Sequence, residues 1–271
     1  MIFNTPERIA ALTPRNPFGR MPDGRPMVPD DLLDRMKLVT NDEAWGTMES
    51  GHGYRYQFTG GWLNMHPDRI LVGRVVTAQF VPIRPDFHEV VAGIGESEGR
   101  SGGQNTWVID QLGPNDVLVV DIFGKIRDGT VIGDNLSTAI ASRTRAGIVI
   151  NGAVRDYVRI RELENFNVFH RGVDPTPIRE VTLAGVNIPI RIDDVTVMPG
   201  DVALGTPEGL TFIPPHLAQQ VVEESENTRQ RDVFGKLRLH QGTYTTGEID
   251  RPDWAEHIEA DYTNWLTTNT R

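Results

Sequence analysis

The chain has 271 residues, enough to bury one sizeable hydrophobic core with further segments around it. Its formal net charge of −10 at pH 7 argues against a nucleic-acid-binding surface, because phosphate binding needs clustered lysine and arginine. The absence of cysteine excludes disulfides, thiolate metal sites and cysteine nucleophiles. No apolar run approaches the roughly 20 residues of a membrane span, and the first residues do not resemble a signal peptide. We therefore expect a cytoplasmic protein that does not bind membranes.

The first 69 residues are predicted to be an N-terminal arm followed by an aromatic, glycine-rich segment. Residues 1–30 are rich in proline, which leaves little room for helix and favours an extended arm. Asp30–Leu38 is expected to start a short helix. Asn41–Trp62 is interpreted as a loop that packs against another subunit or, as the less favoured alternative, covers a substrate pocket.

Residues 70–229 are predicted to form the main domain, of mixed α/β class. Three apolar runs rich in β-branched residues are expected to be strands: Ile70–Phe80, Val117–Asp121 and Ile148–Ile150. Gly124–Gly129 and Asn151-Gly152 read as polar connections or turns. Between the last two strands, Leu136–Ala146 shows helical spacing, and Gly147 is expected to end that helix.

The remaining segments are predicted from the same signals. Ser97–Asn105 is glycine-rich and expected to be flexible. Pro215–Arg229 should be a helix with Leu217, Val221 and Val222 facing inward. Residues 230–271 are predicted to be a C-terminal arm that ends in a helix over Trp254–Leu266.

Two short motifs within residues 117–156 suggest chemistry. The turn Gly133-Asp134-Asn135-Leu136 precedes the predicted helix, whose free amides and dipole favour an anion such as a carboxylate. Arg155 offers a planar group suited to bidentate contact with a carboxylate. Asp134 and Asp156 are hard oxygen ligands of the kind that Mg²⁺ or Mn²⁺ prefers. Two simpler readings remain open: Asp134 as a helix cap, and Arg155-Asp156 as a surface ion pair.

These motifs resemble those of the RraA-like family. The sequence GDNL followed by a helix and by AGIVINGAVRD is the specific part of the resemblance, and Val168–Gly172 and Val195–Pro214 resemble two further family segments. The family includes class II 4-hydroxy-4-methyl-2-oxoglutarate / 4-carboxy-4-hydroxy-2-oxoadipate aldolases, oxaloacetate decarboxylases and regulators of ribonuclease E activity. The resemblance covers roughly residues 70–235. It implies that residues 70–229 are a catalytic domain and that Ser97–Asn105 lies where the family has a pocket-side segment.

The resemblance implies a role for each matching residue. Asp156 would be the direct ligand of Mg²⁺ (or Mn²⁺), and Arg155 would bind the substrate carboxylate together with the backbone at Gly133, Asn135 and Leu136. Asp134 would hold metal-bound water and orient the catalytic base. A glutamate from a neighbouring subunit would also hold metal-bound water. Its candidates are Glu223, Glu224 and Glu226, with Glu226 favoured.

The family also implies a fold, an assembly and a reaction. The fold would be a three-layer β/β/α swivelling domain, with extended N- and C-terminal arms in this chain. The protein would be a homotrimer or homohexamer whose site is shared between subunits. The reaction would be that of a lyase, an aldolase or decarboxylase that cleaves a 2-oxo acid through a metal-stabilised enolate and releases pyruvate.

Two alternatives remain open. The family usually has an Asp-rich turn after Pro-Gly-Asp-Val, whereas in Gly205–Gly209 one acidic position has moved or gone and Glu208 is the acidic residue present. The chain is also longer than compact members, and both departures leave room for a dehydratase or isomerase acting on a sugar-derived acid. A non-enzymatic regulator that binds a protein partner is the other alternative. His170 is expected to be a packing residue rather than a substrate contact.

Overall fold

The structure is a computed structural model that describes residues 2–269. The chain divides into two compact units, Met1–Val222 and Glu223–Arg271. The boundary falls inside the long helix α8 (Ala218–His240). The predicted division into an N-terminal arm with an aromatic, glycine-rich segment (1–69), a catalytic domain (70–229) and a C-terminal arm (230–271) stays a prediction. Among the described residues, no helix is both long enough and apolar enough to cross a membrane.

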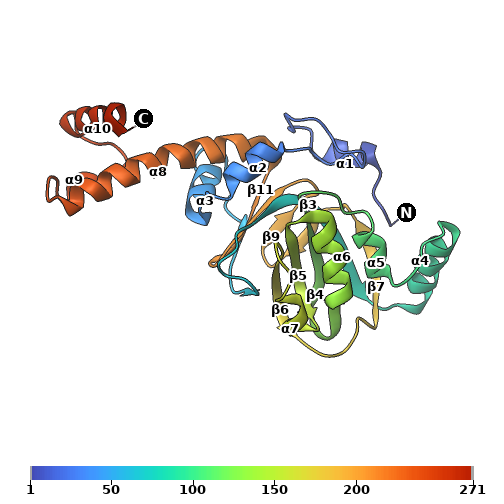
Figure 1. The fold of residues 1–271 in the computed structure, drawn as a ribbon. Helices are drawn as coiled ribbons and strands as arrows, with labels where there is room; N and C mark the ends of the chain where they lie inside the picture. The colour runs from blue at the N-terminus through green and yellow to red at the C-terminus, as the bar shows by residue number, and fades with distance from the viewer. Residues whose placement is uncertain (1, 270–271) are drawn as a thin grey trace. The chain divides into compact units, whose positions relative to one another are not determined.

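One large mixed sheet organises the first unit (Figure 1). Its order is β1-β11-β10-β3-β4-β5-β6-β2, with β7 paired to β3. The strands β3, β4, β5 and β6 are parallel, and the others pair antiparallel. The bounds are β1 Phe58–Thr59, β2 Leu63–Asn64, β3 Leu71–Pro82, β4 Asp116–Ile132, β5 Gly147–Val154, β6 Asn167–Val173, β7 Val181–Val186, β10 Val202–Thr206 and β11 Gly209–Ile213.

The two faces of this sheet are covered differently, which produces three layers. On one face, α5 (Gln104–Ile109), α6 (Asp134–Thr144) and α7 (Tyr157–Ile160) bury apolar residues such as Ile140 against β4 and β5. On the other face lies the hairpin of β8 (Ile190–Ile192) and β9 (Val195–Val197), packed on Val119 and Val149. The predicted α/β class with a β/β/α layering is confirmed.

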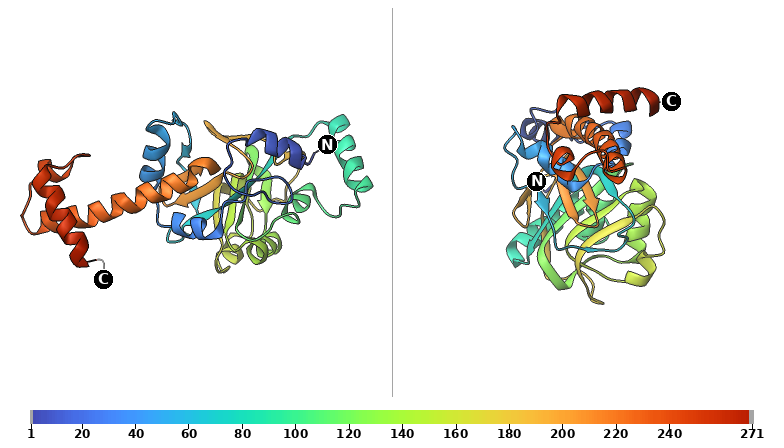
Figure 2. Two further views of the ribbon diagram at one scale, coloured as in Figure 1. Left: turned by 90° about the horizontal axis from the view of Figure 1, so that it is seen from above. Right: turned by 90° about the vertical axis from the view of Figure 1, so that its left-hand side faces the viewer.

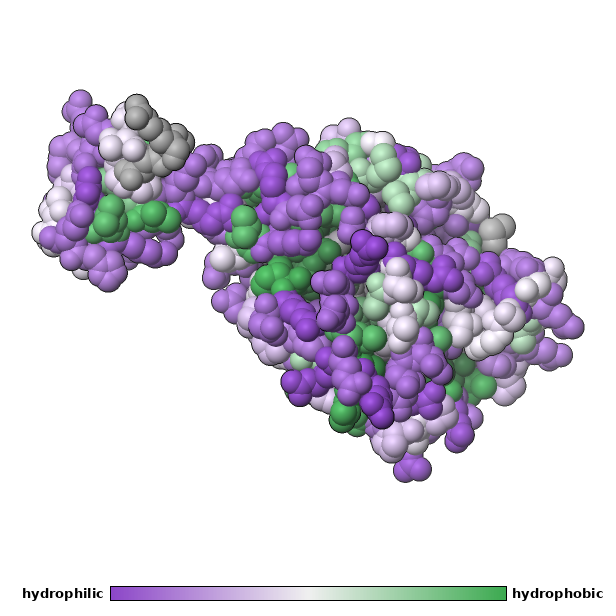
Figure 3. All heavy atoms as spheres, viewed as in Figure 1, coloured by the Kyte–Doolittle hydropathy of each residue, from purple (hydrophilic) through white to green (hydrophobic). Residues whose placement is uncertain are grey.

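A further hydrophobic cluster joins the N-terminal region to the sheet. It contains residues of α2 (Asp30–Met36), α3 (Asn41–Glu49), β10 and the start of α8, which follows the short helix η1 (Pro215–Leu217). On the face shown in Figure 3, hydrophobic atoms form small patches among hydrophilic ones, as expected when most large apolar side chains are buried.

The N-terminal region contains more helix than the sequence predicts. Pro6 begins helix α1 (Pro6–Leu12), where proline is tolerated because the first-turn amide needs no partner. Asn41–Glu49 is helix α3 rather than part of a loop, and a capping box of Thr40 and Glu43 fixes its start. The predicted short helix is present as α2. In the view from above, α1 (dark blue) lies across the first unit (Figure 2).

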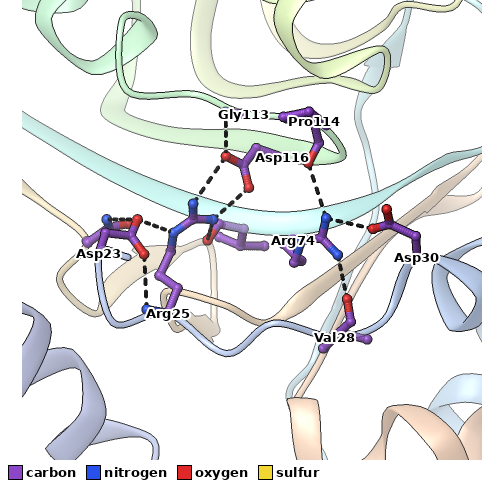
Figure 4. A network of polar contacts seen from close by, with 10 residues as sticks. Asp23, Arg25, Val28, Asp30, Arg74, Gly113, Pro114 and Asp116 are labelled. Atoms are coloured by element: carbon purple, nitrogen blue, oxygen red, sulfur yellow. Dashed lines mark hydrogen bonds and ion pairs between the residues drawn. The ribbon is translucent and has the colours of Figure 1, made fainter. Parts of the chain in front are cut away.

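Buried ion pairs hold this region to the sheet (Figure 4). The guanidinium of Arg25 lies 2.8 Å and 3.1 Å from the two carboxylate oxygens of Asp116, and its Nε lies 2.6 Å from Asp23. Arg25 and Asp116 are both almost fully buried. Arg74 is also buried and forms a single contact with the exposed Asp30, with an Nη2–Oδ1 distance of 2.8 Å. The predicted extended arm is therefore an integral part of the first unit.

Two predicted connections are strand instead. The segment Gly124–Gly129 lies within β4, which continues past Asp121 to Ile132 with shifts in register. Asn151-Gly152 lies within β5. Helix α6 ends at Thr144 with Arg145 in the left-handed conformation (φ 54°), so Gly147 does not end the helix but begins β5.

The second unit is a small helical assembly. The end of α8 packs against α9 (Thr246–Ile249) and α10 (Glu256–Asn269) around the buried ring of Phe234, which lies 5.4 Å from the Trp254 ring. Arg238 and Asp261 form a bidentate pair with both distances 2.7 Å. The predicted terminal helix is present, starting at Glu256, and α4 (Pro85–Ser97) of the first unit was not predicted.

Candidate functional site

The strand ends of β4 and β5 bring the two predicted motifs together. The Arg155 N–H donates to the Ile132 carbonyl at 3.1 Å, which places the end of β5 beside the residue that precedes Gly133. The Asp134 N–H in turn donates to Oδ2 of Asp156 at 3.3 Å. Residues 22 positions apart therefore meet at the N-terminus of α6.

Asp134 occupies the first turn of α6 rather than the cap. Gly133 is the N-cap residue, and its carbonyl accepts hydrogen bonds from the Ser137 N–H at 3.0 Å and from the Ser137 hydroxyl at 2.7 Å. The carboxylate of Asp134 accepts from the Asn135 N–H at 2.8 Å. The reading of Asp134 as only an N-cap is thus incorrect. The exposed carboxylate of Asp134 adds negative charge at the N-terminus of α6, where the helix dipole favours it.

Asp156 adopts a left-handed backbone conformation with φ 54°, between the end of β5 and the start of α7. This conformation is uncommon for residues other than glycine, asparagine and aspartate. Its Oδ2 lies 3.7 Å from Nε of Arg155. The Arg155 and Asp156 side chains are 45% and 39% exposed, so both can reach a ligand from solvent or from another chain.

Gly133 provides the space for these two side chains. A Cβ at this position would lie 2.4 Å from Oδ2 of Asp156 and 2.9 Å from Nε of Arg155. No real Cβ contact is that short, so any larger residue would displace the site side chains. Glycine is required here for close approach and not for backbone conformation, since its φ is −124°.

Comparison with known proteins identifies the family. The family model described as RraA-like, aldolase/RraA, matches residues 31–211, more than half of the chain. The chain belongs to the RraA-like family.

Relatives of this RraA-like chain carry several names. A putative 4-hydroxy-4-methyl-2-oxoglutarate aldolase of Halalkalibacterium halodurans is 27% identical over 148 residues, covering 54% of this chain and 70% of the relative. The 4-hydroxy-4-methyl-2-oxoglutarate aldolase of Thermus thermophilus is 30% identical over 40% of this chain and 64% of the relative. Protein DlpA of Legionella pneumophila is 30% identical over 72% of this chain, which spans only 30% of DlpA.

Solved structures show the same fold. An uncharacterized protein from Pseudomonas syringae has a TM-score of 0.68 at 22% identity, covering 86% of this chain and 97% of that one. Streptomyces coelicolor RraAS2, described as an unusual member of the RNase ES inhibitor RraA protein family, has a TM-score of 0.67 at 24% identity and covers 82% of this chain and 100% of that one.

The residues of this RraA-like site suit a hard divalent cation. Asp156 and Asp134 present exposed carboxylates that are joined through the Asp134 amide. Within residues 2–269, no group of three or more acidic or histidine side chains converges to form a complete protein cage. Mg²⁺ does not need one, because it keeps several waters and is often bound by one or two carboxylates.

Of the other predicted residues, His170 packs beside Tyr157, the residue that follows Asp156, and the glutamate candidates cannot be placed against the cluster. His170 is buried on β6, its Nδ1 lies 3.0 Å from the Gly172 carbonyl, and burial lowers its pKa. This packing matches the prediction. The candidates Glu223, Glu224 and Glu226 lie on α8 in the second unit, so a role in a neighbouring site stays a prediction.

Asn105 is a neighbour of the site that the sequence reading missed. It lies on α5, and its Nδ2 donates to the Val131 carbonyl at 2.8 Å, two residues before Gly133. The segment Ser97–Asn105 was predicted to be flexible and to lie where the family has a pocket-side segment, but Asn105 itself was not singled out. The available signal was the polar run Gln104-Asn105-Thr106 before the apolar run Trp107–Ile109, a pattern typical of a helix start.

Proposed function

We propose that this chain is a divalent-metal-dependent lyase that cleaves a 2-oxo acid, by aldol cleavage or decarboxylation, and releases pyruvate. The observation that supports this most is the meeting of Asp134, Arg155 and Asp156 around Gly133 at the N-terminus of α6. The aldolase names of the relatives from Halalkalibacterium halodurans and Thermus thermophilus support the same reaction class.

Arg155 and the first turn of α6 would bind the substrate carboxylate. The guanidinium can donate two parallel hydrogen bonds to a carboxylate, and its partial exposure leaves it accessible. The amides of Asp134 and Asn135 already donate to site carboxylates. The Leu136 amide, one residue further into α6, is the next donor available to an anion at this helix end.

Asp156, with Asp134 beside it, would hold Mg²⁺ or Mn²⁺. When bound, such an ion supplies Lewis-acid stabilisation of the negative charge that develops on the keto oxygen during cleavage. Asp134 would hold a water molecule by hydrogen bonding and orient it to take the proton of the substrate's C4 hydroxyl. Decarboxylation needs no such base, so an Asp134 variant should keep more decarboxylase than aldolase activity.

The site would be completed by a second copy of the chain in a trimer or hexamer. The supporting observation is the exposure of Arg155 and Asp156, because cleavage chemistry gains strength when water is excluded from the site. Light scattering coupled to gel filtration would measure the assembly. A monomer with full activity would contradict this part of the proposal.

The test is pyruvate release from oxaloacetate and from 4-hydroxy-4-methyl-2-oxoglutarate, followed with lactate dehydrogenase. The wild type should release pyruvate from at least one compound, whereas Asp156→Asn should not. Asp86→Asn serves as the matched control, because Asp86 is an exposed aspartate paired with Arg84 and should be dispensable. Equal activity in the wild type and in Asp156→Asn would refute the assignment. No activity on either compound would favour a sugar-acid dehydratase, and failure to bind metal as well would favour a protein-binding regulator.

A further inference from the structure

A cavity lies in the first unit between α4, the loop that follows it, α5 and the residues that precede β7. Its volume is about 560 Å³, within the range of small-molecule sites. The residues of the candidate catalytic site, Asp134, Arg155 and Asp156, are not among those that line it. The cavity adjoins that site without including those three residues, because Asn105, which lines it, donates to the Val131 carbonyl two residues before Gly133.

Three polar side chains that line the cavity are each fixed at one atom. Oε1 of Gln104 accepts from the Leu183 N–H at 2.7 Å, and Nδ2 of Asn105 donates to the Val131 carbonyl at 2.8 Å. Nδ1 of His88 lies 2.9 Å from the Thr182 hydroxyl. These bonds determine the amide orientations and leave Gln104 Nε2, Asn105 Oδ1 and His88 Nε2 as the remaining hydrogen-bonding atoms.

Trp107 adds a buried donor without a partner. Its side chain lines the cavity and is 7% exposed, and among the described residues nothing accepts a hydrogen bond from its Nε1. The ring is held in place, because a Cβ on Gly95 of α4 would lie 2.2 Å from its Cη2 atom. An unpaired buried N–H costs free energy, which a ligand that accepts its hydrogen bond would recover.

The charges around the cavity balance. Glu96 and Glu180 line it together with Arg100 and Arg179. A purely anionic or purely cationic ligand would meet like charges, and a purely apolar one would leave the polar atoms unsatisfied. A hydroxyl group both donates and accepts, so a ligand with several hydroxyls matches this mixed set of donors and acceptors.

We propose that this α4–α5 cavity binds a polyhydroxylated small molecule, a sugar or a sugar acid. Gln104, Asn105, His88 and Trp107 bind its hydroxyls, and the aromatic faces lining the cavity pack against its C–H groups. The proposal concerns binding in this adjoining cavity and does not require the proposed lyase activity.

The test measures binding of D-glucose, D-gluconate and succinate to the full chain by calorimetry. Gln104→Glu is the sharpest variant, because it keeps Oε1 for the Leu183 N–H but replaces the free donor with an acceptor. Trp107→Phe removes the buried N–H, and Asp156→Asn is the control for the catalytic site. Thermal unfolding confirms that each variant is folded.

Wild type should bind D-gluconate or D-glucose and not succinate, with at least tenfold weaker binding in Gln104→Glu and unchanged binding in Asp156→Asn. Binding of both polyols indicates recognition of hydroxyls alone, whereas binding of gluconate alone adds a carboxylate contact to Arg100 or Arg179. Three results would overturn the proposal. The first is no binding of either polyol at millimolar concentration, and the second is binding by both Gln104→Glu and Trp107→Phe that is as tight as in the wild type. The third is loss of binding in Asp156→Asn. The last would assign the ligand to the catalytic site.

Discussion

Replacing Gly133 with alanine should disable the site without unfolding the protein. The added Cβ would lie 2.4 Å from Oδ2 of Asp156, whereas ordinary contacts of a Cβ begin near 3.4 Å. The carboxylate must therefore move by about 1 Å, and a displacement of that size at a reacting centre costs about a hundredfold in kcat/KM. The backbone itself tolerates alanine, because φ is −124°.

Stability should change little in the same variant. The displaced atoms are the ends of the half-exposed side chains of Arg155 and Asp156, which can move into solvent, so the free energy of unfolding should fall by less than about 1 kcal/mol. The matched control is Gly46→Ala in α3, where a Cβ meets nothing within 4 Å. That variant should keep full activity and gain up to about 1 kcal/mol from its higher helix propensity.

The assay combines pyruvate release with urea unfolding of both variants and the wild type. Full activity in Gly133→Ala would refute the claim that Gly133 provides the space for Asp156 and Arg155. Loss of activity together with a large loss of stability would refute the claim that only the site side chains move.

The remaining predictions concern two buried ionisable side chains outside the site, Asp116 and Asp201. Asp116→Asn should lower the free energy of unfolding by about 3 kcal/mol, because it leaves the buried guanidinium of Arg25 without its main countercharge. In urea unfolding, a change no larger than that of the exposed control Asp86→Asn would contradict this. Asp201 is the second case, since complete burial raises its pKa to about 8. The folded state then holds a proton that the unfolded state releases above its ordinary pKa of 3.8, so this residue should lower stability by about 1.4 kcal/mol per pH unit between about pH 4 and pH 8. Asp201→Asn should remove that decline, and an unchanged slope in stability against pH would show that the carboxyl is not buried in its neutral form.

The sequence predicted the strands and the helix that carry the site because their apolar patterns match the buried positions. β3, β5 and α6 were expected within a few residues of their observed bounds. The resemblance to the RraA-like family implied that Asp134 and Asp156 share a site, and the structure brings them together because β4 and β5 are parallel neighbours that end at the same edge of the sheet. The motifs were therefore sufficient to predict which residues gather at α6.

The errors came from turn signals that tertiary contacts override. Asn151-Gly152 is typical of a turn, yet it is paired strand here, and glycine is needed because a Cβ at Gly152 would lie 2.2 Å from Cγ2 of Ile122. The proline content of residues 1–30 concealed α1 and the buried Arg25, whose partner Asp116 lies 91 positions away. No local pattern predicts a pairing over that distance.

The most direct test of the proposed function is metal removal and return. The purified protein would be stripped with a chelator, and its rate of pyruvate release would be measured while Mg²⁺ or Mn²⁺ is added back, beside Asp156→Asn. We expect no activity in the stripped protein, saturable recovery with either ion, and no recovery in the variant. Full activity after stripping, or equal recovery in Asp156→Asn, would contradict a metal-dependent lyase site at Asp156.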